Sequence, residues 1–449
     1  MDGFTPYDIV MDIGWISALL IVGNLMRRFI PWFQKLLIPA PITAGLLGLL
    51  LGPNGLGVIQ FSEHFSDYAT ILIAVVFGAL PFTMNFNAKV RQGARTMWSY
   101  SVGMYLAQWG FFALLGVLLF APLFGTPDWF GIMLPVGFVG GFGVAAAVGG
   151  ALDSAGMTEA TTLGFTAAAV GMFSAIIGGV IFARWGSKKG YTNELPHFDK
   201  LPEDMRKGII SLPGHGPSVG RATTSPSSIE PIALHIAVLT VVLFLGNILT
   251  DWINNTFPGL SFPLFAMAFL VGLAVVGMLH LLKAPHYIDN KLMGSVSGAS
   301  TDFLVAVGIA SIIPAVVATY IVPLIILFLI GLAFCLFLFF YIGPRTFDHG
   351  WFERSVFTWG WATASVATGI AVLKIVDPDM RSGTLEEFAM AYVGFAPFEI
   401  AAAILAPIAI IAGMVWLFGG VALIGGLVLL IPPMVWLKKS RARAAQKVE

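Results

Sequence analysis

Charge is scarce in this chain of 449 residues, since only 11% of them are Asp, Glu, Lys or Arg. Soluble globular proteins carry roughly 25% of these residues. Polar linkers are scarce too, although a soluble chain of this length would be divided into two or three domains. Hydrophobic residues make up 57% of the chain. The composition therefore excludes an ordinary soluble protein and predicts a polytopic membrane protein of the all-α class.

Three further absences narrow the function. The 24 basic and 24 acidic residues cancel, so no charge excess favours nucleic acid as a partner. The single cysteine, Cys335, excludes an intrachain disulfide. The chain contains no HExxH, GxSxG or P-loop pattern, and therefore nothing indicates a protease, a hydrolase or an ATPase. We predict that the protein is not an enzyme, that it needs no cofactor, and that any uphill transport is coupled to an ion.

Eleven segments are apolar enough for transmembrane helices, each of which needs about 20 mainly apolar residues. We predict spans at 12–27, 36–52, 68–86, 98–122, 160–183, 231–250, 262–282, 292–315, 317–342, 386–412 and 415–437. Two other stretches, 131–150 and 356–374, are rich in Gly, Ala, Ser and Thr and poor in Leu and Ile. These two are predicted to be re-entrant hairpins, which enter and leave the membrane on one side.

The basic residues predict the orientation, because Lys and Arg are retained on the cytoplasmic side. With the N-terminus outside and the two hairpins not crossing, all 24 Lys and Arg residues fall on the inside. The loops that then lie outside, at 53–67, 123–130, 151–159 and 251–261, contain none. The C-terminal tail is predicted to be cytoplasmic.

The chain is predicted to consist of two inverted repeats. Residues 186–230, rich in Pro and Gly, form a cytoplasmic linker between an N-terminal repeat (1–185) and a C-terminal repeat (231–412). Each repeat has four spans, a hairpin and a fifth span, and an odd number of spans gives the two halves opposite topology. Ile38–Gly48 and Phe262–Gly272 share Pro, Ala, Leu and Gly at an offset of 224. Residues 413–449 add an extra span and a basic tail.

The hairpins are the candidate substrate sites. Irregular backbone at membrane depth is tolerated only where protein or water satisfies its polar groups, and it can present N–H groups to an anion or carbonyls to a cation. The first hairpin contains Val136-Gly-Phe-Val-Gly-Gly-Phe-Gly143, and the second contains hydroxyls at Thr363, Ser365 and Thr368. Close helix packing through small residues is the alternative interpretation of the glycines.

Two carboxylates within spans are candidates for the coupling ion. Glu399 and Asp302 lie near the middle of their spans, and neither span contains a basic residue. An intramembrane charge is costly and by default indicates function. Each carboxylate would therefore bind a cation such as Na⁺ or take up a proton, unless it is held neutral by hydrogen bonds in packing. Thr161 and Thr162, at the start of the fifth span, could contribute further oxygens to the site.

Several motifs resemble the bacterial sodium/glutamate symporter family. They are Ile38-Pro-Ala-Pro-Ile-Thr-Ala-Gly45, Gly140-Gly-Phe-Gly143, the span from Ala160 to Gly179, and the segment from Phe388 to Ala403. The resemblance implies two inverted five-helix halves with a Gly-Gly-x-Gly hairpin. It also implies Na⁺-coupled glutamate import across the bacterial inner membrane, a homodimer, and an elevator-like movement. Trp359-Gly-Trp361 departs from the Gly-rich second hairpin of that family.

The sequence thus predicts a secondary transporter with its ligand sites where the two hairpin tips meet. Gly140, Gly141, Gly143, Thr161, Thr162, Thr363, Ser365 and Thr368 would bind substrate, and Asp302 and Glu399 would bind the cation. Import of another carboxylate, such as a dicarboxylate or hydroxycarboxylate, driven by Na⁺ or H⁺, is the alternative. A channel would need polar or charged pore-lining rings, and a receptor would need a soluble signalling domain. Neither feature is visible in the sequence.

Overall fold

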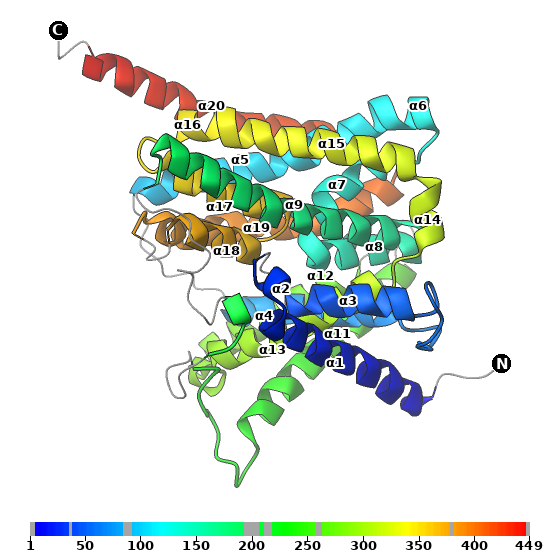
Figure 1. Ribbon diagram of the computed structural model, residues 1–449. Helices are drawn as coiled ribbons and strands as arrows, with labels where there is room; N and C mark the ends of the chain where they lie inside the picture. Colours follow the sequence, from blue (N-terminus) through cyan, green and yellow to red (C-terminus); the bar gives the residue numbers. More distant parts are fainter. Residues whose placement is uncertain are drawn as a thin grey trace. The chain divides into compact units, whose positions relative to one another are not determined.

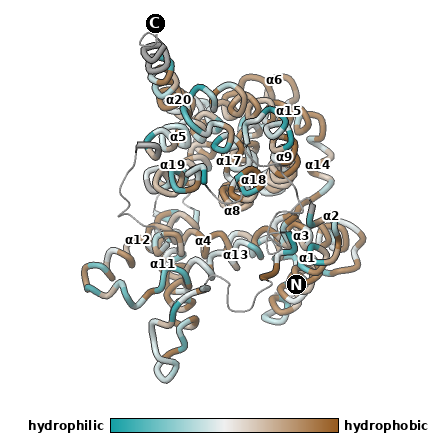
Figure 2. The backbone as a smooth tube through the Cα atoms, turned by 60° about the vertical axis from the view of Figure 1, so that its left-hand side comes forward, coloured by the Kyte–Doolittle hydropathy of each residue, from teal (hydrophilic) through white to brown (hydrophobic). Residues whose placement is uncertain are grey.

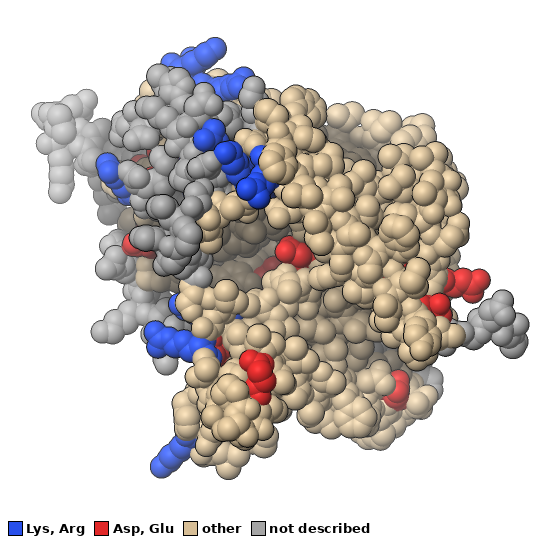
Figure 3. All heavy atoms as spheres, turned by 60° about the horizontal axis from the view of Figure 1, so that its bottom comes forward, with Lys and Arg blue, Asp and Glu red and all other residues tan. Residues whose placement is uncertain are grey.

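The computed structural model describes residues 5–35, 38–83, 92–192, 206–210, 218–256, 263–377 and 381–445 (Figure 1). These residues form helices and loops and include no β-strand. Nine of the described helices are long and apolar enough to cross a membrane. The hydrophobic residues run along whole helices, as Figure 2 shows for α15 (Ile321–Phe337). Uncharged residues make up most of the face in Figure 3. The all-helical class of the prediction is confirmed.

Two predicted spans correspond to shorter helices. The segment predicted at 36–52 forms α3 (Ala40–Leu51), and the segment at 68–86 forms α4 (Asp67–Thr83). At 1.5 Å per residue α3 is about 18 Å long, shorter than the ~30 Å hydrocarbon core of a bilayer. Pro39 precedes α3 and Gly52 ends it. The prediction of a full-length span at 36–52 is therefore too long.

Contacts between Cα atoms divide the chain into two compact units, and each contains parts of both halves of the sequence. Unit 1 comprises residues 1–85, 146–162 and 203–314, and unit 2 comprises 86–145, 163–202 and 315–449. The complete helices of unit 1 are α1 (Pro6–Phe29), α2 (Pro31–Lys35), α3, α4, α11 (Pro231–Thr256), α12 (Leu264–Leu281) and α13 (Asn290–Ala310).

Small residues bring the helices of unit 1 into close contact. A methyl group added at Gly48 on α3 would lie 2.8 Å from Cβ of Ala310 on α13. A methyl group added at Gly272 on α12 would lie 2.7 Å from the carbonyl oxygen of Gly78 on α4. Gly48 and Gly272 are the last residues of the two similar motifs in the sequence. They explain part of that similarity, because both glycines permit close approach of a neighbouring helix.

Unit 2 contains the remaining long helices, the whole second predicted hairpin and the tip of the first, whereas residues 146–150 of the first hairpin belong to unit 1. Its elements are α5 (Gln92–Leu115), a π-helical turn at Gly116–Phe120, α6 (Ala121–Phe124), a 3₁₀ turn at Phe130–Ile132, α7 (Met133–Gly137), the start of α8 (Gly141–Ser154), most of α9 (Ala160–Lys189), α15, a second π-helical turn at Leu338–Ile342, α16 (Gly343–Thr346), α17 (Trp351–Thr363), α18 (Val366–Val376), α19 (Thr384–Ile411) and α20 (Val415–Ala445). A short helix, α14 (Pro314–Thr319), begins at the last residue of unit 1. Of the predicted linker, 193–205 and 211–217 lie outside the described residues, and Gly186–Lys189 continue α9.

The helix added at the C-terminus, α20, packs along α5. Glycines on both helices make the contact: a methyl group added at Gly110 would lie 2.1 Å from the backbone nitrogen of Leu423, and one at Gly426 would lie 2.5 Å from the backbone nitrogen of Ala107. Small residues let two membrane helices approach closely enough for extensive van der Waals contact. The extra span is therefore an integral part of unit 2.

We expect the Gly110→Ala variant to lower the free energy of unfolding by about 2 kcal/mol, because its methyl group forces the backbones of α5 and α20 apart. Thermal unfolding of the purified protein measures this effect. Gly420→Ala is the matched control, because a methyl group added at Gly420 on α20 has nothing within 4 Å. Equal melting temperatures for the two variants would contradict the close packing of α5 and α20.

Candidate functional site

The first hairpin consists of α7 and α8, joined by a short break. The helical conformation ends at Phe138, whose φ and ψ are −72° and −91°. Gly141 then has a φ of +62°, in the left-handed region that glycine adopts without a steric penalty. The Gly-Gly pair predicted as the tip of this hairpin thus permits a sharp turn into α8.

The second hairpin consists of α17 and α18. Its break is at Ala364 (φ −147°, ψ −78°) and Ser365 (φ −161°, ψ 164°). Ser365 is the N-cap of α18, and its Oγ accepts a hydrogen bond of 3.3 Å from the backbone N–H of Thr368. A serine at this position satisfies one of the free N–H groups at a helix start.

The two breaks lie next to each other in unit 2. A methyl group added at Gly141 would lie 2.9 Å from the carbonyl oxygen of Ala364 and 3.8 Å from Cβ of Ser365. The N-terminus of α8 therefore lies beside the N-terminus of α18. Each N-terminus carries a partial positive charge and free N–H groups, which attract anions.

The backbone donors differ from those we predicted at the first tip. The N–H of Gly140 donates to Pro135 O at 2.9 Å, and the N–H of Gly141 donates to Phe138 O at 3.1 Å. These two N–H groups close the turn. The N–H of Gly143 lies in the first turn of α8, where a helix provides no intrahelical acceptor. Of the three predicted glycines, Gly143 is therefore the one placed to donate to a ligand.

The predicted hydroxyls of the second tip also have local partners. Oγ1 of Thr363, which is completely buried, donates to Trp359 O of its own helix at 2.7 Å. Oγ of Ser365 and Oγ1 of Thr368 lie 3.0 Å apart at the start of α18. Ser365 and Thr368 are thus adjacent at the tip, whereas the Thr363 hydroxyl is turned back along α17.

Thr161 and Thr162 lie at the base of the first hairpin. A methyl group added at Gly149 would lie 2.6 Å from Cα of Thr161. Gly149 is eight residues along α8 from Gly141, about 12 Å at 1.5 Å per residue. The structure therefore does not bring these two threonines to the tip of their own hairpin.

The second hairpin packs on the small residues of α9, and this contact accounts for the bulk of Trp359. The indole of Trp359 packs where Gly178 has no side chain, since an added methyl group would meet it at 2.4 Å. Nε1 of Trp359 donates to Ala175 O at 3.1 Å. A methyl group at Gly171 would lie 2.1 Å from Thr363 O, beside the tip. Bulk on α17 is thus matched by glycines on α9.

At the base of each hairpin a carboxylate accepts hydrogen bonds from backbone N–H groups. Oδ1 of Asp153, near the end of α8, accepts a hydrogen bond of 3.1 Å from the N–H of Ala160. Asp377, directly after α18, accepts hydrogen bonds from the N–H groups of Arg381 (2.8 Å) and Ser382 (2.9 Å). Asp153 and Asp377 are 224 residues apart, at the same offset as the two similar motifs.

An ion pair ties the start of α17 to α19. Arg354 is only 7% exposed, and its guanidinium donates to both carboxylate oxygens of Glu387, from Nε at 2.9 Å and from Nη2 at 2.7 Å. Nη1 donates to His349 O at 2.7 Å. A bidentate pair of this kind holds both partners in one geometry.

Glu399 is half-buried on α19 in unit 2, and its Oε2 accepts a hydrogen bond of 3.0 Å from the hydroxyl of Tyr392. The hydroxyl of Tyr105 on α5 lies 3.4 Å from the backbone oxygen of Glu399. Pro397, two residues earlier, has no N–H to continue the helical hydrogen bonds. The Glu399 carboxylate thus lies beside the phenol oxygen of Tyr392, on a helix interrupted by proline.

Asp302 is exposed on α13 in unit 1, so the two predicted ion-binding carboxylates belong to different units. The hydroxyls nearest to it in sequence, Ser300 and Thr301, donate to Val296 O and Ser297 O of their own helix. Among the described residues no group of three or more His, Cys, Asp or Glu side chains forms a metal cluster. A cation at either carboxylate would need hydroxyl or carbonyl oxygens as further ligands.

Gln108, which is completely buried on α5, was not predicted from the sequence. Its Nε2 donates to Ala362 O, two residues before the second break, at 3.1 Å. Its Oε1 has no hydrogen-bond partner among the described residues. An amide in the apolar span 98–122 was the available signal, since buried polar groups are normally paired. Tyr392 was missed as well, and its spacing of seven residues from Glu399 could have indicated that both share a helix face.

The sequence of residues 7–362 matches the family model that describes the sodium/glutamate symporters. The match contains the first hairpin and nearly all of α17, whereas Ser365, Thr368 and Glu399 lie beyond it. No match was found among curated proteins.

Proposed function

The chain belongs to the sodium/glutamate symporter family and is a multi-pass membrane protein, and from this membership we propose that it imports glutamate together with Na⁺. The structural observation that carries the proposal is the adjacency of the α8 and α18 N-termini at Gly141 and Ala364. A second candidate is import of another carboxylate, a dicarboxylate or hydroxycarboxylate, coupled to Na⁺ or H⁺. The same two helix ends favour it, because they recognise a carboxylate rather than an amino group.

In this proposal the substrate carboxylates bind at the two tips. The N–H groups in the first turn of α8, including that of Gly143, and the Ser365 and Thr368 hydroxyls at the start of α18 donate to them. Gly140, Gly141 and the Thr363 hydroxyl shape the tips, since their own hydrogen bonds close the turns. Thr161 and Thr162 contact the substrate only if it passes the base of the first hairpin.

Glu399 and Asp302 serve the cation in this proposal. A hard cation accepts carboxylate, hydroxyl and carbonyl oxygens, and the Glu399 carboxylate lies beside the Tyr392 hydroxyl. Na⁺ near the tips would compensate the negative charge of the substrate. No cofactor other than the coupling ion takes part.

The finer architecture that we propose is an inverted repeat with two re-entrant hairpins. Corresponding elements support it: α1 and α11, α3 and α12, α4 and α13, and α9 and α19 begin 223 to 225 residues apart. Unit 1 supports it too, because α3 packs on α13 and α12 packs on α4. A repeated pair of helices related by two-fold pseudosymmetry would exchange partners in this way.

Both hairpin tips belong to one compact unit, and this supports an elevator-like displacement of the hairpins during alternating access. The exposed apolar side chains of α11, such as Ile236, Phe244 and Trp252, would face lipid. We propose a homodimer in the bacterial inner membrane with the N-terminus outside and the C-terminus in the cytoplasm. We propose repeats at 1–185 and 231–412 and an extra span with its tail at 413–449, joined by a linker at 186–230 whose first four residues, Gly186–Lys189, continue α9.

Uptake of labelled L-glutamate into proteoliposomes tests the proposal. We expect accumulation with an inward Na⁺ gradient and none when K⁺ replaces Na⁺. Malate and citrate, each with a Na⁺ or a proton gradient, distinguish the second candidate. Accumulation of one of these instead of glutamate would identify the protein as a carboxylate transporter of different specificity, and absence of any uptake by the folded protein would contradict both candidates.

A further inference from the structure

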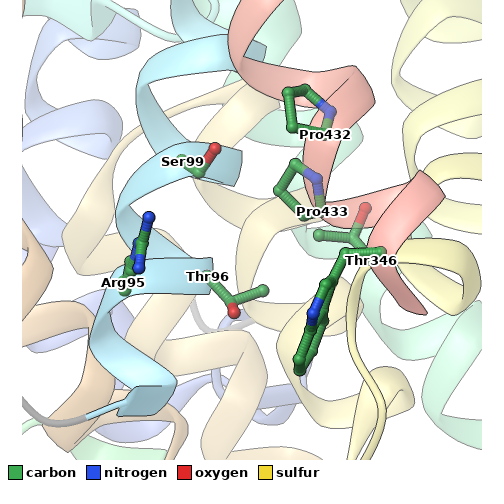
Figure 4. Close-up of a pocket in the computed structure, with 7 residues that line it drawn as sticks. Arg95, Thr96, Ser99, Thr346, Pro432 and Pro433 are labelled. Atoms are coloured by element: carbon green, nitrogen blue, oxygen red, sulfur yellow. The ribbon is translucent and has the colours of Figure 1, made fainter. Parts of the chain in front are cut away.

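A cavity of about 420 Å³ lies outside the hairpins, in unit 2, where α5, α16 and α20 meet (Figure 4). Its lining residues are Arg95, Thr96, Ser99, Thr346, Pro432, Pro433 and Trp436. Small-molecule pockets typically occupy about 300–1,000 Å³. The cavity is therefore large enough for a ligand, and no role in glutamate transport accounts for it.

The cavity lies at the ends of three candidate spans. Arg95, Thr346 and Trp436 are within two residues of the ends of the spans Ala94–Phe124, Ile321–Thr346 and Val415–Lys438. Trp436 is 62% exposed, and tryptophan is enriched at the membrane–water interface. The cavity therefore lies at the depth of the lipid headgroups, on the side predicted to be cytoplasmic.

Two hydroxyls of the cavity are already donating to backbone oxygens. Pro433 has no N–H, so the carbonyl of Leu429, four residues earlier in α20, lacks its helical partner. Oγ of Ser99 donates to this carbonyl oxygen at 2.6 Å. Oγ1 of Thr346 donates to Ile342 O at 2.9 Å. The double proline therefore opens α20 beside α5 without leaving the Leu429 carbonyl unpaired.

The remaining donors of the cavity are the Arg95 guanidinium, the Thr96 hydroxyl and the indole N–H of Trp436. Within the described part of the chain, none of the three has a hydrogen bond or an ion pair. An adjoining cavity of about 370 Å³ contains two carboxylates, of which Glu387 is paired with Arg354. The other, Asp348, lies 3.6 Å from Nε2 of His349. The unpaired charge on the lining of the first cavity is therefore the positive charge of Arg95.

We propose that this cavity binds a phosphate group, with Arg95 as its charged partner and Thr96 as a second donor. Arginine matches phosphate because its planar guanidinium can donate two parallel hydrogen bonds. Basic pockets between transmembrane helices on the cytoplasmic side are suited to anionic lipid headgroups. An anionic lipid and a soluble phosphate share this chemistry, and the depth of the cavity favours the lipid.

Native mass spectrometry of the purified full-length protein tests the proposal. Dioctanoyl phosphatidylglycerol is titrated against the protein and compared with dioctanoylglycerol, which has the same chains and no phosphate. We expect phosphatidylglycerol to bind wild type about tenfold more tightly than Arg95→Gln, because a charge-assisted contact is lost. Thr96→Val should reduce binding less, since it removes one neutral donor. Competition with inorganic phosphate distinguishes the two sources.

The matched control is Arg345→Gln, one residue before Thr346. It removes the same charge at the same membrane depth, but the Arg345 guanidinium lies 3.8 Å from the Tyr341 ring and donates to Tyr341 O. Retained binding in this variant and loss in Arg95→Gln would support the site. Displacement of the lipid by millimolar phosphate would support the site with a soluble ligand. Unchanged binding in Arg95→Gln, or an equal loss in Arg345→Gln, would overturn it.

Discussion

Replacing Glu399 by Gln is expected to remove the Na⁺ dependence of glutamate uptake and to lower the uptake rate at saturating Na⁺ by about 100-fold, which equals about 2.7 kcal/mol. Gln has nearly the same shape and can still accept the hydrogen bond from Tyr392. It lacks the negative charge that would bind the cation. Folding should therefore change less than transport, and initial rates in proteoliposomes over a range of Na⁺ concentrations measure the difference.

Two further variants on α19 test whether the effect is specific to the Glu399 carboxylate. Glu386→Gln removes an exposed carboxylate from the first turn of α19 and should leave Na⁺ activation unchanged. Tyr392→Phe removes the hydroxyl bound to Oε2 of Glu399 and should raise the Na⁺ concentration for half-maximal uptake about tenfold, because a hydrogen bond to a charged group that positions the carboxylate is lost. Normal Na⁺ activation in Glu399→Gln, at normal expression, would remove Glu399 from the coupling site.

The Gly141→Ala variant is expected to lower glutamate uptake at least tenfold. Its backbone has a φ of +62°, which costs an L-residue about 1–2 kcal/mol. The added methyl group also lies 2.9 Å from Ala364 O and would push the two tips apart. The donors on α8 and α18 could then no longer bind one substrate molecule together. Uptake and the melting temperature of the same preparation are measured side by side.

Gly156→Ala separates backbone strain from the contact between tips. Gly156 also has a positive φ, +90°, but a methyl group added there has nothing within 4 Å. It should lower the melting temperature about as much as Gly141→Ala and leave uptake close to wild type. If uptake falls equally in both variants, the contact between Gly141 and Ala364 does not contribute to transport.

The sequence predicted the helices well because burial in a membrane imposes a composition that is visible residue by residue. The breaks at Gly141 and Ser365 lie within the two stretches that were set apart for their Gly, Ala, Ser and Thr content, although the sequence did not place the breaks themselves. The length of α3 was not predicted correctly, because Leu36 and Leu37 are apolar and were included in the predicted span. What ends the helix is the backbone geometry at Pro39 and Gly52.

The candidate site was harder to predict than the helices. Thr363 was predicted to face substrate, but its hydroxyl donates to Trp359 O, a choice of rotamer that composition does not determine. Gln108 lies about 250 residues from Ala362, so the hydrogen bond between them depends on long-range packing. Asp302 and Glu399 were treated alike because their sequence surroundings are similar. One is exposed in unit 1 and the other half-buried in unit 2.

Because α5 packs on α20, a delay separates the synthesis of α5 from that of its partner helix. Roughly 300 residues separate Gly110 from Leu423, and ribosomes add about 5–20 residues per second. The glycine face of α5 therefore waits roughly 15–60 s in the membrane before its partner emerges. During that interval it is open to other helices, to chaperones of membrane insertion and to proteases. In a nascent chain that stops before α20, this face of α5 would stay without its partner helix and would remain accessible to proteases.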